Sequence, residues 1–76
     1  EDYVITNRGE AEDVLSRMDE MISVYGMVSV ADLYDLIGVT GNYTDNKYGW
    51  TDIRSASVVR VRDGYIVKMP KAMPLD

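Results

Sequence analysis

The 76-residue sequence predicts an α+β domain with two amphipathic helices followed by a β-hairpin near the C-terminus. Three observations support this prediction. Apolar residues recur at helical spacing in two segments, and each segment lies between a capping residue and a glycine. Two β-rich runs flank the dipeptide Asp63-Gly64. An aromatic-rich segment with no clear periodicity connects the second helix to the hairpin.

A chain of this length has room for one core, so we expect a single domain over residues 7–69. Residues 1–6 favour an extended tail or edge strand, and residues 70–76 an extended tail that begins at a proline. The sequence starts Glu1-Asp2-Tyr3 without an initiator methionine, which suggests a domain of a longer protein or, as the less favoured alternative, a processed product.

Both helices have capping signals at their two ends. Asn7 followed by Glu10 predicts the start of the first helix, and Gly26 its end. Ser29 with Asp32 predicts the start of the second helix, and Gly38 its end. Their apolar stripes, one tryptophan and one hairpin face should form the core, which we predict to contain Val14, Leu15, Met18, Ile22, Leu33, Leu36, Ile37, Trp50, Val59, Val61 and Ile66.

The connecting segment is rich in aromatic residues. Trp50 is expected to close the core, because a packed tryptophan buries on the order of 200 Å². Tyr43 and Tyr48 are equally compatible with core packing and with an exposed aromatic platform for a ligand or a base.

The Asp63-Gly64 dipeptide predicts a two-residue hairpin turn. This register places Arg62 opposite Tyr65, and period-two alternation then divides the hairpin into two faces. Val59, Val61 and Ile66 should pack on the helices. The opposite face should carry Arg60, Arg62, Tyr65 and Val67 outward.

The net charge of −5 is unevenly distributed. Residues 1–46 contain ten carboxylates and two arginines, whereas residues 47–71 contain six basic side chains and two acidic ones. The basic part suggests a partner-binding strip formed by Arg54, Arg60, Arg62, Tyr65 and Lys71. The alternative is that these arginines pair with the acidic helices of the same molecule.

Residue types argue against catalysis. The chain has no cysteine and no histidine, so it lacks a thiol nucleophile and the commonest general base and zinc ligand. No phosphate-binding glycine motif or calcium-loop spacing is present. We therefore expect no enzyme activity, no catalytic residue, no cofactor and no metal. With no signal peptide and no apolar run long enough for a membrane span, we expect no membrane partner and a cytoplasmic location in the host cell.

Three stretches, VSVADLYDLIGV, NYTDNKYGWTDI and VVRVRDGYIVKMP, resemble a short domain near the C-terminus of proteins from phages and prophages of Gram-positive bacteria. The resemblance covers residues 9–75. It implies a phage origin and a compact domain, and it assigns no catalytic or binding residue. The element order also resembles a small winged-helix module.

The segment where a DNA-reading helix would fall, between Val39 and Ile53, contains two glycines and one basic residue, Lys47. It therefore departs from the pattern of a DNA-reading winged helix. Three functions stay open: an interaction module that docks a protein partner or its own copies, nucleic-acid binding through the basic hairpin, and an acidic mimic of DNA that blocks a host protein.

Overall fold

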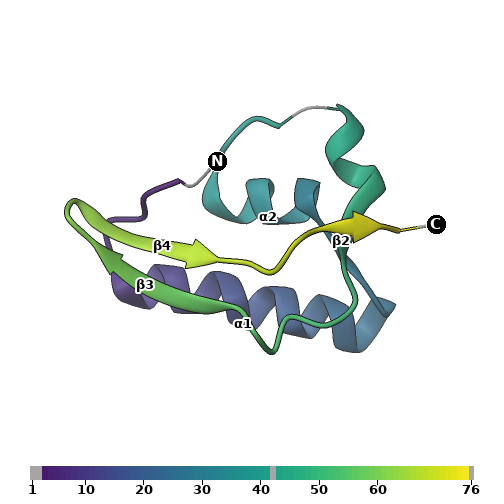
Figure 1. Cartoon of the computed structure of the whole chain (residues 1–76), viewed down its shortest axis with the longest axis horizontal. Helices are drawn as coiled ribbons and strands as arrows, with labels where there is room; N and C mark the ends of the chain where they lie inside the picture. Colours follow the sequence, from purple (N-terminus) through teal and green to yellow (C-terminus); the bar gives the residue numbers. More distant parts are fainter. Residues whose placement is uncertain (1–2, 42, 76) are drawn as a thin grey trace.

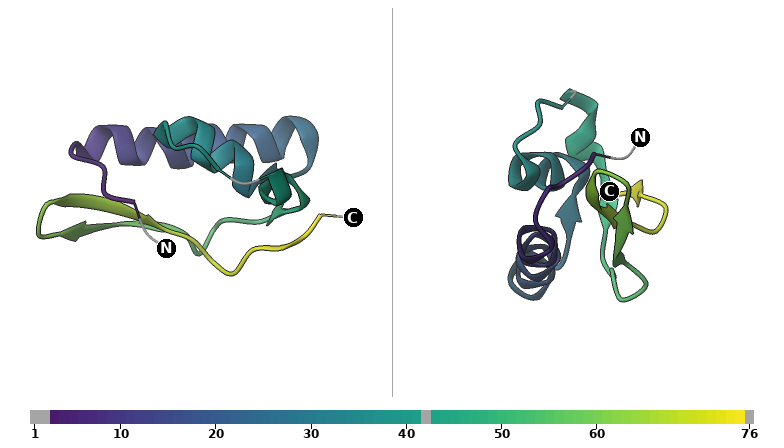
Figure 2. Two further views of the ribbon diagram at one scale, coloured as in Figure 1. Left: turned by 90° about the horizontal axis from the view of Figure 1, so that it is seen from above. Right: turned by 90° about the vertical axis from the view of Figure 1, so that its left-hand side faces the viewer.

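The computed structural model describes residues 3–41 and 43–75 (Figure 1). In chain order the elements are α1 (Arg8–Tyr25), β1 (Val28–Ser29), α2 (Val30–Ile37), the 3₁₀ helix η1 (Tyr43–Lys47), β2 (Tyr48–Trp50), β3 (Ser57–Val61), β4 (Gly64–Lys68) and β5 (Met73–Pro74). Both α-helices lie on one side of the strands (Figure 2). The predicted α+β class with two helices and a hairpin is therefore confirmed.

The helix boundaries follow the predicted caps. The Asn7 side chain accepts a hydrogen bond of 3.2 Å from the Glu10 backbone N–H. Ser29 and Asp32 form a capping box, in which each side chain accepts from the other residue's backbone N–H at 3.0 Å. Both helices end at a glycine in the left-handed conformation, as a residue without Cβ allows.

A small three-stranded sheet joins distant parts of the chain in the order β1-β2-β5, with both pairs antiparallel. β1 is the two-residue strand between the helices, and Val28 lies opposite Trp50. β5 lies in the segment expected to be an extended tail. The C-terminal segment is therefore extended, and it also pairs with the domain, because Tyr48 lies opposite Pro74 in the β2–β5 ladder.

The hairpin exists, but its predicted register is wrong. Arg60 lies opposite Tyr65, and Val61 lies opposite Gly64, so the turn residues are Arg62 and Asp63. Gly64 has a positive φ of 153°, as predicted, but it is the first residue of β4. Because glycine has no side chain, the backbone of Ile5 can approach Gly64 closely. A Cβ at Gly64 would lie 2.5 Å from the Ile5 carbonyl oxygen.

The prediction of which hairpin face meets the helices is also wrong. The register shift is two residues, so the alternation of the faces is unchanged. Val67 packs against the core together with Ala56 and Met69, whereas Val59 and Ile66 lie on the opposite, outward face. β4 is apolar at Tyr65, Ile66 and Val67 in succession, so alternation alone does not distinguish its buried face.

The core is formed by α1, β1, β2 and the loop after β2. Its buried members are Val14, Met18, Val28, Trp50 and Ile53. Around them pack Leu15, Ile22, Leu33, Leu36 and Ile37, which belong to the core as predicted but are half-buried and not largely buried. The prediction was wrong for Val59, Val61 and Ile66, which are half-buried and, among the described residues, do not pack against this cluster. It missed Val28 and Ile53, which lie in short segments without a periodic pattern.

Within residues 3–41 and 43–75, no helix has both the length and the apolar character that a membrane span requires.

Candidate functional site: the hairpin surface and an aromatic pocket

The basic residues predicted to form one strip lie at separate places. Arg60 and Tyr65 face each other across the β3–β4 ladder, and Arg62 lies in the turn at the tip of the hairpin. Arg54 precedes β3 and Lys71 follows β4, so both lie beyond the end of the hairpin that is away from the turn. The structure therefore brings Arg60, Arg62 and Tyr65 together and leaves Arg54 and Lys71 apart from them.

Arg54 is engaged within its own loop. Its guanidinium donates to both carboxylate oxygens of Asp52, at 2.8 to 3.1 Å, and its backbone N–H also donates to Asp52 at 2.9 Å. These hydrogen bonds from Arg54 lower the pKa of the Asp52 carboxyl and raise the pKa of the Arg54 guanidinium. Arg54 is therefore less available to a partner than the sequence suggested.

Arg60 and Arg62 are exposed, and within the described part of the chain neither forms an ion pair with a carboxylate. The acidic helix α1 instead has its own cationic partners. Arg8 pairs with Glu12 at 3.3 Å, and Arg17 pairs with Asp13 at 2.8 Å. The alternative prediction, that the hairpin arginines pair with the acidic helices, is therefore wrong for Arg60 and Arg62.

An apolar surface lies on the outward face of the hairpin, next to Arg62 in the turn, whereas Arg60 lies on the opposite face together with Tyr65 and Val67. The outward face of the hairpin consists of Val59, Val61 and Ile66, all half-buried. Val4 extends it from the N-terminal segment: it is 50% exposed, and its Cγ1 would lie 3.0 Å from a Cβ on Gly64. We call these four residues the outer hairpin face. Apolar area next to unpaired guanidinium groups is typical of protein-binding surfaces.

The N-terminal segment is a further strand position beside β4. Ile5 and Tyr65 exchange two backbone hydrogen bonds, each of 2.7 Å. Tyr3 then contacts Tyr34 of α2 edge-to-face, with ring centroids 5.6 Å apart and an interplanar angle of 80°. The N-terminal segment thus lies beside β4 at Ile5 and brings Tyr3 into contact with α2.

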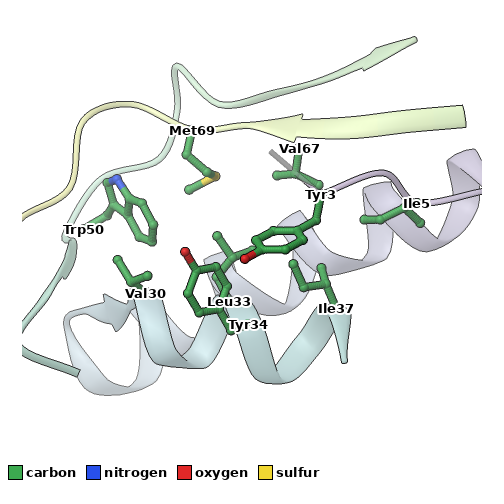
Figure 3. Close-up of a pocket in the computed structure, with 9 residues that line it drawn as sticks. All are labelled: Tyr3, Ile5, Val30, Leu33, Tyr34, Ile37, Trp50, Val67 and Met69. Carbon is green, nitrogen blue, oxygen red and sulfur yellow. The ribbon is translucent and has the colours of Figure 1, made fainter. Parts of the chain in front are cut away.

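A pocket of about 230 Å³ lies between the N-terminal segment, α2 and β4 (Figure 3). Val30, Leu33 and Tyr34 line it from α2, and Trp50 and Met69 line its other side. Sequence analysis missed this pocket. The available signals were Tyr34, which widens the apolar stripe of α2, and the strand-favouring run that starts at Tyr3.

The aromatic residues of the connecting segment have different environments. Trp50 is 6% exposed and closes the core, as predicted. Tyr48 is 47% exposed, which leaves it on the surface. The side chain of Tyr43 is outside the part that the structure describes. Within the described residues, no group of three or more acidic side chains is arranged to hold a metal ion.

The fold and these surfaces define the chain as a small α+β domain with an exposed, partly basic hairpin. Comparisons with protein-family models, curated protein sequences and solved structures give no match.

Proposed function

We propose that this chain is a non-enzymatic interaction domain of a phage or prophage protein, acting in the host cytoplasm, and that it docks a protein partner or its own copies through the hairpin. One observation supports this most directly. Arg60 and Arg62 are exposed and have no carboxylate partner among the described residues. Arg62 follows Val61 of the outer hairpin face at the turn, and Arg60 lies on the other face of the same hairpin. Arginine beside apolar area contributes strongly to binding at interface centres.

A double charge reversal, Arg60→Glu with Arg62→Glu, tests this proposal. The parent chain is first examined by sedimentation for self-association and by affinity capture with host-cell protein. The variant should lose at least about tenfold in the affinity of whichever association the parent shows, because each lost charge-assisted contact contributes about 1.5–3 kcal/mol. Its melting temperature should stay close to that of the parent, since neither arginine forms an ion pair with a described residue.

The matched control reverses two arginines on α1, Arg8→Glu with Arg17→Glu. Both side chains are exposed, so the change in net charge is the same at a different surface. This control should retain the association. Equal loss in both variants would indicate a general charge effect, and unchanged association in the hairpin variant would contradict the proposed role of the hairpin.

Nucleic-acid binding is a second candidate, favoured by the same two free guanidinium groups, which can donate to phosphate oxygens. In this version the hairpin acts as the wing of a winged-helix-like domain. In chain order only the five-residue η1 and β2 lie between α2 and the hairpin, so contacts would come from the hairpin and not from a helix in the major groove. Binding to duplex DNA should then weaken steeply with salt, and Arg60→Glu with Arg62→Glu should reduce that salt dependence.

A further inference from the structure

The pocket in Figure 3 has walls from four separate parts of the chain. Tyr3 comes from the N-terminal segment, Leu33 from α2, Trp50 from β2, and Met69 from the segment after β4. A pocket between several packed elements is a usual kind of site for small molecules.

Within residues 3–41 and 43–75, the lining has no charged side chain. Its side chains are aliphatic, methionine or aromatic, and Tyr3 and Tyr34 add phenol groups to it. The indole N–H of Trp50 is already bonded to the Pro70 carbonyl oxygen at 2.8 Å, so Trp50 offers its ring surface alone. A charged ligand would lose its hydration here without gaining an ionic partner, and the pocket therefore favours a neutral one.

The size and shape of the walls favour an aromatic ring. The volume of about 230 Å³ exceeds the roughly 150 Å³ of an apolar cavity that is known to accept benzene in another protein. There is room for one ring and a small substituent, and too little room for a larger, drug-sized ligand. The Tyr3–Tyr34 pair and Trp50 supply ring faces and edges, against which another ring packs in stacked or edge-to-face geometry.

Tyr3, which forms one wall of the pocket, lies in a segment with few hydrogen bonds to β4. Among the described residues, one antiparallel bridge, between Ile5 and Tyr65, fixes this segment to β4. A small displacement of Tyr3 would widen the pocket without disturbing α2 or β4.

We propose that this pocket binds one free, neutral, single-ring aromatic molecule. This inference does not depend on the proposed role of the hairpin.

The test uses p-cresol as the probe and the intact chain. Trp50 is the single tryptophan, so its fluorescence reports directly on the pocket. We expect a saturable change in Trp50 fluorescence, with nuclear Overhauser effects between the ring protons of p-cresol and the methyl groups of Val30 and Leu33. Benzoate, which has the same ring and a negative charge, should bind at least about tenfold more weakly.

Two matched variants separate the pocket from the surface. Val30→Phe places a ring inside the pocket and should weaken p-cresol binding at least about tenfold. Val24→Phe makes the same change at a position that is 66% exposed, and should bind p-cresol like the parent. If Val30→Phe does not fold, the nuclear Overhauser effects in the parent decide the question without a variant.

Three outcomes would overturn the proposal: a fluorescence change that does not saturate, equal binding of benzoate and p-cresol, or no contact between p-cresol and the Val30 and Leu33 methyl groups. Binding of N-acetyltyrosinamide without binding of p-cresol would also overturn it, because the pocket would then be specific for a residue of a peptide. Loss of p-cresol binding in Arg60→Glu with Arg62→Glu is not expected, since neither arginine lines the pocket.

Discussion

Trp50 and Pro70 are joined by a hydrogen bond of 2.8 Å, in which the indole N–H donates to the proline carbonyl oxygen. The bond connects Trp50 in β2 to Pro70, which lies between β4 and β5. The two residues are 20 positions apart along the chain. It also holds a large ring against the core without leaving its one polar atom unpaired, which burial in an apolar environment would make costly.

Trp50→Phe should therefore destabilise the fold. The phenyl ring keeps most of the apolar contact, but the Pro70 carbonyl oxygen loses its donor, and the smaller ring leaves unfilled space. We expect a loss of about 1–3 kcal/mol in the free energy of unfolding, measured by urea denaturation with circular dichroism. Tyr48→Phe is the control, because Tyr48 is 47% exposed and its change should cost less than about 0.5 kcal/mol. Equal midpoints for the two variants would show that the Trp50–Pro70 bond contributes no stability.

Gly49→Ala should disrupt the β1–β2 pair. A Cβ at Gly49 would collide with the Val28 carbonyl oxygen and lie 2.7 Å from the Ser29 Cα, both of which are backbone atoms that cannot move aside like a flexible side chain. Because Val28 is fully buried, the strain would reach the core, and we expect a loss of about 1–3 kcal/mol in unfolding free energy.

Gly9→Ala is the comparison for this prediction. Gly9 lies in the exposed first turn of α1, where the nearest atom to a new Cβ is the Asn7 side-chain oxygen at 3.1 Å, and alanine favours the helix. It should cost much less than Gly49→Ala. A Gly49→Ala variant as stable as the parent would contradict the close packing of Gly49 against the backbone of β1.

The Asp52 carboxyl should titrate below its ordinary pKa, because hydrogen bonds from Arg54 stabilise its charged form. A lowered pKa in the folded state means that this interaction stabilises the fold above the pKa of the unfolded chain and is lost as the pH falls through the folded pKa. The ¹³C shift of the Asp52 carboxyl, followed by NMR through the acid range, measures it. Arg54→Gln should raise this pKa toward the ordinary value, whereas Arg8→Gln should leave it unchanged. An Asp52 pKa that is the same in the parent and in Arg54→Gln would disprove the coupling.

Local chemistry within one segment determined the parts of the fold that the sequence predicts. The capping residues Asn7 and Ser29 and the terminal glycines Gly26 and Gly38 specify both helices, because each contact spans no more than a few residues along the chain. Asp63-Gly64 predicts a hairpin for the same reason. Trp50 was recognised as a core residue from its size alone.

Tertiary contacts decided the remaining features. The hairpin register is offset by two residues from the turn-based expectation, and Gly64 lies where the backbone at Ile5 comes close. β4 has apolar residues on both faces, and the helices cover the one that carries Val67. Arg60 has no carboxylate partner among the described residues, and the pocket beside Tyr34 has walls from several segments. Both features depend on segments that meet only in the folded chain. Such long-range contacts leave no periodic signal in the sequence, because they depend on how whole elements pack.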